Sequence, residues 1–364
     1  MVSYVMQYLI GLRRLGHDVY FVEKSGYASS CYDPERNAMT SDCSYGVGVI
    51  RRLFDHFGLT DRFCFVDEEN RYHGMPAKKV DEVFGSSDLF MEMGTHEAWL
   101  DESAHSQRRI LLDGDPGFSQ IWLEQRKAAG ERPPEYDAYF SVGSNVGTPI
   151  STAPTAGETW HHYFHPVVTD LFPVVPADKS APFTTVMNWE SYKPVEYNGR
   201  KYGHKNIEFE KFMDLPHLTS IPLEAAVAGP NVPREALASR GWKVREGTST
   251  TTTVDSFWDY IRGSRGEFTV CKNGFVEMQT GWFSDRSSAY LASGRPVVMQ
   301  DTGFGSHLPC GSGLVAVKTA EEAAVALEEI NGDWERHSKA AREIAVEHME
   351  AAVVLTRLLQ EAGI

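Results

Sequence analysis

Apolar residues recur at helical and strand-like spacings along the first half of the chain. Residues Val2–Leu15 place apolar side chains three and four positions apart and precede Gly16, which predicts a helix ended by a glycine. The next run, His17–Glu23, is short and rich in β-forming residues, which predicts a strand. The same alternation predicts helices at Ser44–Phe57 and Lys78–Phe84 and strands at Arg62–Val66, Asp88–Met93, Arg109–Leu112 and Asp137–Val142. Such alternation is typical of a parallel sheet with helices on both faces.

The second half repeats this alternation from Phe183 onward. Strands are predicted at Phe183–Asn188, Ser220–Leu223, Trp242–Arg245, Glu267–Cys271, Pro296–Gln300 and Gly313–Val317. Helices are predicted at Asn206–Met213, Arg234–Arg240, Val254–Arg262, Ser284–Ser293, Ala320–Ile330, Trp334–Glu347 and Glu350–Ala362. The threonine-rich run at Thr248–Thr253 is expected to be a solvated loop.

The length of 364 residues and a proline-rich stretch near residue 175 predict two domains. We expect an N-terminal domain over residues 1–172, a linker over 173–182, a C-terminal domain over 183–347, and a closing helix over 348–364 that packs back on the first domain. The expected fold is α/β, with two Rossmann-like, doubly wound parallel sheets facing a cleft between the carboxyl ends of their strands.

One irregularity concerns the start of the first sheet. A doubly wound domain normally opens with a strand at the centre of its sheet, whereas the first predicted element here is a helix. Either a strand lies upstream of the sequence or this sheet lacks its usual first strand. The loop that follows such a strand, a common place for ligand-binding groups, is then missing as well.

Composition and charge narrow the range of functions and partners that the chain can have. The chain has 35 Lys and Arg against 50 Asp and Glu, a formal net charge of −15, which disfavours nucleic acid and anionic membranes as partners. Its 5 cysteines are scattered without a C-x-x-C pair, so neither a disulfide framework nor a zinc site is expected. No apolar run approaches the roughly 18–20 residues that span a bilayer, and no signal peptide is recognised. We expect a cytoplasmic monomer or homodimer that needs no cofactor.

Several nucleotide-binding and hydrolase motifs are missing. Gly46 and Gly48 form a G-x-G, but Arg51 stands where a dinucleotide-binding motif has its third glycine. No P-loop motif and no G-x-S-x-G nucleophile elbow occurs in the sequence. These absences argue against an NAD enzyme, a P-loop ATPase and an α/β-hydrolase.

The segment Lys272–Gly305 carries the most chemistry. A Gly- and Ser-rich loop leads into a predicted helix whose first turn contains Ser284, Arg286 and Ser287. Free N–H groups at a helix start, hydroxyl donors and a guanidinium together suit a phosphate-bearing ligand. In the alternative interpretation Ser284 or Asp285 only caps the helix. The strand that follows delivers four polar or small residues to its carboxyl end, where they can contact ligand hydroxyls: Gln300, Asp301, Thr302 and Gly303.

These residues resemble the nucleotide-sugar-binding half of the GT-B glycosyltransferases, in the SGRPVV and QDTGF segments at Ser293–Val298 and Gln300–Phe304. The segment GLRRLGHDVYFVE at Gly11–Glu23 resembles the first helix and second strand of that superfamily, and Trp160–Pro173 resembles the connection before its donor domain. The resemblance covers nearly the whole chain. It implies that the second half binds a nucleoside-diphosphate sugar and the first half an acceptor.

The resemblance also assigns basic residues to the donor diphosphate. Lys205 and Lys272 stand where the superfamily places cations beside the phosphates, and together with Arg286 they would make a metal ion unnecessary. In the alternative interpretation both lysines are ordinary surface residues. The paired Glu of the retaining branch is absent, because Gly281 and Ala289 occupy its positions. The histidine of the inverting branch would follow the missing strand, so the stereochemistry stays unassigned.

Three side chains in the first half are candidates for the base that activates an acceptor hydroxyl. His96 follows a strand at the expected cleft, Asp115 stands in an Asp-Pro-Gly turn, and His161 lies near the hinge. The alternative for Asp115 is a helix-capping role. His161 and His165 have a spacing that suits a metal on a helix, but without a nearby carboxylate or cysteine we expect no metal site.

The sequence therefore predicts a metal-independent glycosyltransferase that moves a sugar from a nucleoside-diphosphate sugar to an acceptor. Two alternatives remain open. One is a nucleotide-sugar epimerase on the same fold, and the other is a bilobal protein that binds a small ligand without chemistry.

Overall fold

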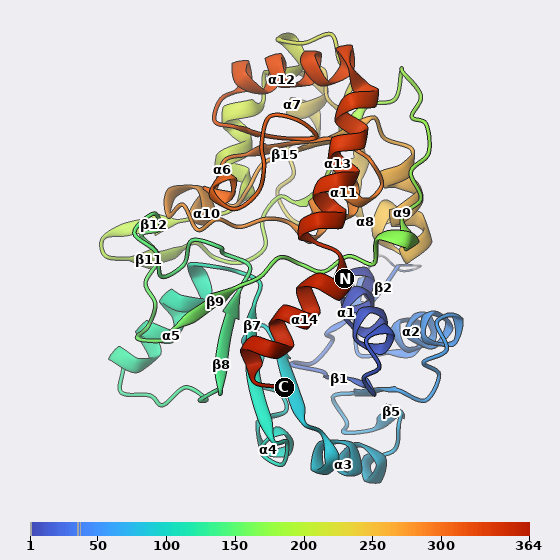
Figure 1. The fold of residues 1–364 in the computed structure, drawn as a ribbon, viewed down its shortest axis with the longest axis vertical. Helices are drawn as coiled ribbons and strands as arrows, with labels where there is room; N and C mark the ends of the chain where they lie inside the picture. The colour runs from blue at the N-terminus through green and yellow to red at the C-terminus, as the bar shows by residue number, and fades with distance from the viewer. Residues whose placement is uncertain (1, 35, 37) are drawn as a thin grey trace.

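The computed structural model describes residues 2–34, 36 and 38–364 of the chain. They form two α/β domains, one above the other in Figure 1, which are linked by the segment that precedes residue 183 and by the C-terminal helices. The predicted fold class, two Rossmann-like domains with parallel sheets, is confirmed.

The N-terminal domain has a sheet in two parts. One part has the strand order β1-β4-β5 and the other β6-β7-β8-β9, with all neighbours parallel except β4 and β5. The strands are β1 Phe21–Lys24, β4 Phe63–Val66, β5 Tyr72–Gly74, β6 Leu89–Met93, β7 Arg108–Asp113, β8 Ala138–Ser141 and β9 Trp160–His162, with a separate hairpin of β2 Cys31–Asp33 and β3 Ala38–Thr40. The helices are α1 Val2–Arg14, α2 Ser44–His56, α3 Ala77–Ser86, α4 Leu100–Ser103 and α5 Phe118–Ala128.

The C-terminal domain has one continuous six-stranded parallel sheet of order β14-β13-β10-β15-β16-β17. Its strands are β10 Phe183–Asn188, β13 Leu223–Ala228, β14 Lys243–Glu246, β15 Gly266–Thr269, β16 Val297–Gln300 and β17 Leu314–Val317, and β11 Val195–Tyr197 pairs with β12 Arg200–Tyr202 as a hairpin. The helices are α6 Lys205–Phe209, α7 Arg234–Ser239, α8 Gly247–Thr251, α9 Val254–Arg262, α10 Asn273–Glu277, α11 Asp285–Ala292 and α12 Ala320–Gly332.

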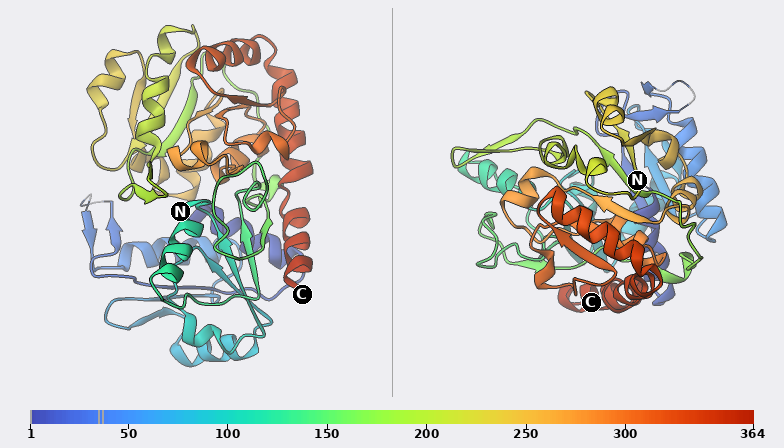
Figure 2. Two further views of the ribbon diagram at one scale, coloured as in Figure 1. Left: turned by 90° about the vertical axis from the view of Figure 1, so that its left-hand side faces the viewer. Right: turned by 90° about the horizontal axis from the view of Figure 1, so that it is seen from above.

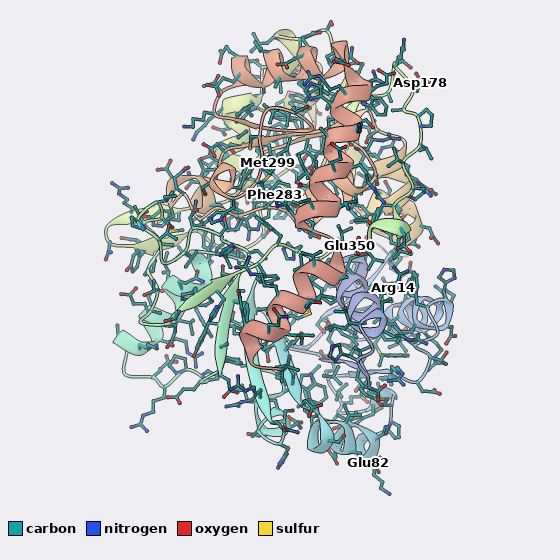
Figure 3. The ribbon with its side chains drawn as sticks, viewed as in Figure 1. Arg14, Glu82, Asp178, Phe283, Met299 and Glu350 are labelled. Carbon is teal, nitrogen blue, oxygen red and sulfur yellow. The ribbon has the colours of Figure 1, made fainter. Side chains whose placement is uncertain are left out.

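Two last helices join the domains a second time. Helix α13, Trp334–His348, lies along the C-terminal domain beside α11, and α14, Ala351–Ala362, runs on into the N-terminal domain and packs against α1 (Figure 2). Glu350 lies at the joint between them (Figure 3), where its carboxylate accepts the hydroxyl and the backbone N–H of Thr169. This bond holds the turn against the segment that leads into the second domain.

Two predictions of local structure are wrong. The threonine-rich run is α8 followed by a cap for α9, because hydroxyls such as those of Thr250 and Thr251 bond to the carbonyl of Gly247 and so need no water. The second strand of this domain covers Leu223–Ala228 and not Ser220–Leu223, since burial between β10 and β14 outweighs the low strand propensity of its alanines. The pattern also missed α5 and β9.

The domains meet through a polar contact as well as through helices. Asn145, which follows β8 and is fully buried, donates its amide to the carbonyls of Gln279 and Gly303 at 3.2 and 3.1 Å and accepts the hydroxyl of Ser306. Ser144 donates to the carbonyl of Gly281. Because these partners belong to the C-terminal domain, one turn of the first domain fixes two loops of the second.

Among the described residues, no helix combines the length and the apolar character that a membrane crossing requires.

The close contact of α1 and α14 generates a prediction about Gly11. A Cβ at this position would lie 2.6 Å from Leu355 and 2.8 Å from Ala351, whereas one at Gly46, in α2, would meet nothing within 4 Å. We expect Gly11→Val to push α14 off α1 and to lower the free energy of unfolding by about 1–3 kcal/mol. Thermal unfolding measures this loss. Gly46→Val makes the same change of helix propensity in an open place and should not destabilise the fold, so equal losses for the two variants would contradict the tight packing.

Candidate functional site

Helix α11 begins at the boundary between the domains with a capped and largely buried first turn. Ser284 is the N-cap residue, and its hydroxyl accepts the backbone N–H of Arg286 at 3.2 Å. Ser287, also buried, points its hydroxyl toward the sulfur of Met299 in β16. The capping interpretation of Ser284 is therefore correct at the level of local structure.

Two cations and one carboxylate from three different elements lie together at this helix start, where the lysine and the carboxylate are buried and the arginine is partly buried. Lys205, at the beginning of α6, is only 6% exposed, and its Nζ has no hydrogen-bond partner among the described residues. Arg286 contributes an Nε that likewise lacks a described partner. Glu267, in β15, is fully buried, and neither of its oxygens makes a hydrogen bond of good geometry with a described residue, although the hydroxyl of Ser287 lies beside it.

The electrostatics of this cluster are unusual for an acidic protein. Burial and the nearby charge of Arg286 lower the pKa of Lys205 to about 7. Burial raises the pKa of Glu267 to about 7, while Ser287, Arg286 and Lys205 act in the opposite direction. Buried polar groups without partners are costly and rare, and they are concentrated at functional sites. A doubly charged anion placed here would supply the acceptors that the lysine and the guanidinium lack.

The first domain approaches the same helix start from the other side. Asp285 lies near Arg286, with 3.6 Å between their side chains, and although burial favours its neutral form, Arg286 and His165 lower its pKa. Burial raises the pKa of Tyr4 in α1 to about 12, and the charge of Asp285 adds to this shift. His165 also hydrogen-bonds with Tyr8 of α1 at 3.3 Å. The start of α1 thus faces the start of α11.

Lys272 is bound in an ion pair that spans the two domains. Its Nζ lies 2.7 Å from the carboxylate of Asp115, which follows β7, and 3.0 Å from the hydroxyl of Tyr192. Tyr192 also donates to Asp115. Lys272 is close enough for its charge to lower the pKa of Lys205. The structure therefore brings Lys272 near the cationic cluster but holds its ammonium group on a carboxylate of the first domain.

The carboxyl end of β16 is held by internal hydrogen bonds. Gln300 is buried, donates to the carboxylate of Glu208 and accepts the backbone N–H of Cys271 at 3.1 Å. Thr302 donates to the carbonyl of Trp282 at 2.7 Å. Asp301 accepts the N–H of Gly303 and lies 3.6 Å from Lys318.

Gly303 has a φ of +91°, and a Cβ there would lie 2.5 Å from the amide of Asn145. This position therefore needs glycine for both its backbone conformation and its space.

The remaining predicted catalytic residues lie in different places. His96 is exposed after β6, and Asp115 is at the carboxyl end of β7. His161 lies on β9, where its ring stacks near Phe140 and its Nδ1 is 3.5 Å from Glu361 of α14. Asp115 does not cap α5, whose N-cap is the residue two positions later. The structure thus groups Asp115 with Lys272 and leaves His161 on the side covered by α14.

One cluster of potential metal ligands occurs among the described residues, outside the cleft. The side chains of Cys43, Asp67 and His73 approach within 4.8 Å of one another. The oxygens of Asp67 already accept two backbone N–H groups, the guanidinium of Arg71 at 2.8 Å and the ring of His73 at 2.8 Å. This saturated carboxylate closes the turn between β4 and β5.

Sequence reasoning brought Lys205, Ser284, Arg286 and Ser287 to one place, and the structure groups them. It missed Glu267, whose signal was a charged residue inside an otherwise apolar strand. It also missed Tyr192, which lies in an irregular segment without any pattern. His165 was noted only for its spacing from His161, whereas its position beside Asp285 depends on how the two domains meet.

The fold is similar to that of several solved structures. Alr3699/HepE from Anabaena, solved with UDP-glucose, matches with a TM-score of 0.55 and 11% identity over 95% of this chain and 100% of that one. AviGT4, a glycosyltransferase involved in avilamycin A biosynthesis, matches with a TM-score of 0.53 and 13% identity over 99% and 88%. A glycosyltransferase from Rickettsia africae matches with a TM-score of 0.50 and 10% identity over 95% and 98%.

No protein-family model matches the sequence, and no curated protein matches it either. At these identities the structural matches establish the fold, in agreement with the resemblance to GT-B proteins found in the sequence.

The hydrogen bonds of Gln300 predict that this residue stabilises the loops around the site and does not itself contact a ligand. Gln300→Leu removes one donor from the buried carboxylate of Glu208, which keeps Asn273 and Lys211, and it leaves the buried N–H of Cys271 without its acceptor. We expect a loss of about 2–4 kcal/mol in the free energy of unfolding, measured by urea titration. Gln125→Leu removes an exposed amide bonded to a carbonyl and serves as the control. A stability equal to that of the control would show that Gln300 does not support the site.

Proposed function

We propose that the chain is a GT-B glycosyltransferase whose C-terminal domain binds a nucleoside-diphosphate sugar. The observation that carries this proposal is the buried Lys205, whose Nζ has no described acceptor, beside the partly buried Arg286, whose Nε has none either, at the start of α11. The shared fold of glycosyltransferases, one of them solved with UDP-glucose, supports it. A diphosphate has enough oxygens for both cations and for the helix N–H groups at the same time.

In this proposal the positive charge at the site speeds the reaction by stabilising the leaving diphosphate. As the bond between the anomeric carbon and the diphosphate breaks, negative charge grows on the departing phosphate oxygens. Lys205, Arg286 and the first N–H groups of α11 would stabilise this charge, and because the fold already holds them at one helix start, little reorganisation would be needed. We propose that these groups suffice without a metal ion. Burial strengthens each of these interactions, because the local dielectric constant is lower than that of water.

The acceptor would bind on the first domain, above the carboxyl ends of β6 and β7. His96 and Asp115 follow these strands and remain the candidates for accepting the proton of the attacking hydroxyl. We propose that the ion pair of Asp115 with Lys272 holds the domains closed during the reaction and limits hydrolysis of the donor. Asp301 would contact hydroxyls of the donor sugar, while Gln300 and Thr302 support the loop that carries it.

The central test is binding of UDP and UDP-glucose by isothermal titration calorimetry. We expect Arg286→Ala to weaken UDP binding at least about thirtyfold, because a charge-assisted bidentate contact contributes about 2 kcal/mol or more. Arg357→Ala, which removes an exposed arginine paired with Glu361 on α14, is the matched control and should bind as the parent chain does. Equal affinities for both variants would reject the donor site.

Release of UDP then identifies the reaction. A transferase releases UDP from UDP-glucose quickly only when an acceptor is present, whereas an epimerase interconverts the sugar with no acceptor. Activity that persists in EDTA supports the role given to the cations. Failure of UDP, dTDP and GDP sugars alike to bind would leave only a protein that binds another small ligand.

The lowered pKa of Lys205 predicts how donor binding depends on pH. With a pKa of about 7 in the free protein, Lys205 loses its proton as the pH rises through neutrality. Glu267, with a pKa also near 7, gains a negative charge in the same range. Both changes oppose a diphosphate, so the Kd for UDP should rise between pH 7 and 9, by up to about tenfold per unit, with net proton uptake on binding.

Two variants measure the contribution of Lys205 to the pH dependence of UDP binding. Lys205→Arg keeps its charge across this range and should flatten the pH dependence. Lys205→Met should weaken UDP binding without lowering the melting temperature, because it removes a buried cation that has no partner in the free protein. A slope unchanged in Lys205→Arg would assign the pH effect to another group.

A further inference from the structure

Three side chains of different ligand types meet at the carboxyl end of strand β4. Cys43 comes directly before α2, Asp67 follows β4, and His73 lies on β5. One ligand atom from each, a sulfur, a carboxylate oxygen and a ring nitrogen, lies within 4.8 Å of the other two. Cys43 and Asp67 are buried, whereas the side chain of His73 is 29% exposed. The cluster is therefore enclosed by protein and can be reached from solvent past the imidazole.

The fold positions these side chains through local hydrogen bonds and packing. The Oδ1 of Asp67 accepts two backbone N–H groups of the turn that follows β4, both at 3.0 Å, so the carboxylate is held in place. His73 stands opposite Phe65 on the antiparallel pair of β4 and β5, and the centres of their rings lie 6.3 Å apart. Helix α2, which begins after Cys43, packs its apolar face on β4.

Cys43 occupies a helix position that usually carries a different residue type. It is the N-cap of α2, where Ser, Thr, Asp and Asn are preferred because their oxygens accept N–H groups of the first turn. Among the described residues the thiol makes no such capping bond, and its sulfur lies 3.4 Å from the Nε2 of His73. The sulfur therefore belongs to the cluster and not to the helix start.

One nitrogen of the imidazole faces both of the other groups. The Nε2 of His73 is 2.8 Å from the Oδ2 of Asp67 and 3.4 Å from the sulfur of Cys43. A Cys-His-Asp proton relay would use both nitrogens of the ring, one for the thiol and one for the carboxylate. Here a single nitrogen, the sulfur and the oxygen converge on one point, as ligands do around a metal ion.

The distances suit a tetrahedral ion. Zinc bonds of about 2.3 Å to sulfur and about 2.0–2.1 Å to nitrogen and oxygen place nitrogen and sulfur about 3.5 Å apart and nitrogen and oxygen about 3.4 Å apart. The observed nitrogen–sulfur distance of 3.4 Å agrees with this. The nitrogen–oxygen distance of 2.8 Å is that of a hydrogen bond, and it would lengthen by about 0.6 Å when an ion replaces the proton between the two atoms.

The bonds and charges around Asp67 are compatible with such an ion. The ion replaces the hydrogen bond from His73, while the carboxylate keeps its two backbone N–H groups and the guanidinium of Arg71. The turn carries three successive carboxylates, those of Asp67, Glu68 and Glu69, and Arg71 pairs with the first and the third at 2.8 and 2.9 Å. Because the acidic groups outnumber this arginine, the turn attracts cations.

We infer that Cys43, Asp67 and His73 form a zinc site that fastens the start of α2 to the turn between β4 and β5. Thiolate, imidazole and carboxylate together suit Zn²⁺, whereas Mg²⁺ and Ca²⁺ take oxygen ligands. On binding, the thiol releases its proton to solvent, and the neutral imidazole offers the lone pair of Nε2 with its proton on Nδ1. A water molecule takes the fourth position.

This site differs from the zinc sites that the sequence argued against. The absence of a C-x-x-C pair excludes sites built from paired cysteines, whereas a mixed site needs only one. Its three ligands come from separate elements, which only the packing of α2 on the sheet brings together. The role of the ion is to stabilise the first domain, so the inference does not depend on the proposed function.

The test titrates ZnCl₂ into the full chain after its metals have been removed with a chelator and its thiols reduced. We expect calorimetry to give one Zn²⁺ per chain with a Kd below about 1 μM. At a zinc concentration a hundredfold above that Kd, the melting temperature should rise by about 3 °C or more. MgCl₂ should produce neither effect. No nucleotide is used, so failure here leaves donor binding untouched, and a chain that does not bind zinc rejects the site.

Two variants locate the ion. Cys43→Ser and His73→Gln should each weaken zinc binding at least about a hundredfold, because each removes a ligand atom. Cys310→Ser and His17→Gln make the same changes at exposed positions and should bind zinc as the parent chain does. Equal affinities in the two pairs would overturn the inference in favour of adventitious binding by surface side chains.

Cys43→Ser also distinguishes a metal ligand from a packing residue. Serine is a good N-cap, so without metal this variant should melt at about the temperature of the parent chain, and zinc should no longer raise that temperature. The parent chain loaded with Co²⁺ should show a thiolate-to-cobalt charge-transfer band in the near ultraviolet, kept in Cys310→Ser and lost in Cys43→Ser. A band that is missing from the parent chain, or that persists in Cys43→Ser, would contradict the assignment of Cys43 as a ligand.

Discussion

The donor-site interpretation depends on the burial of Lys205 and Glu267 beside the partly buried Arg286, with no salt bridge among these three described side chains. Lys205, Arg286 and Glu267 come from a loop after β10, from the start of α11 and from β15, so only the assembled sheet brings them together. A direct salt bridge would neutralise the lysine and leave nothing for a ligand. Separation keeps the carboxylate as a counter-charge that limits the cost of burial while the cations stay available.

This arrangement requires rigid support, which a second layer of polar residues provides. Glu208, fully buried in α6, accepts from Gln300 at the end of β16 and from Asn273 at the start of α10. Asn273 in turn accepts the N–H of Gly203, just before Lys205. Three loops at the edge of the sheet are therefore tied to one carboxylate, and the position of Lys205 follows from this network more than from its own contacts.

The sequence was sufficient for the fold class because both halves alternate strongly between helical and strand-like patterns. It was sufficient to place Arg286 and Ser284 at a helix start, because a helix start is a local feature of the sequence. Glu267 and Tyr192 could not be found in this way, since their roles depend on neighbours distant in sequence. The partners of Gln300 and Lys272 were unpredictable for the same reason: Glu208 is 92 positions from Gln300, and Asp115 is 157 positions from Lys272.

Helix α1 links the unusual features of the molecule. Its last turn packs against α14 at Gly11, and its first turn faces the start of α11 near Tyr4. One of its faces lines the cavity between β1 and β6. Helix α1 therefore connects the first sheet to the boundary at which α11 begins, whereas the cations proposed to bind the donor, Lys205 and Arg286, belong to the second domain.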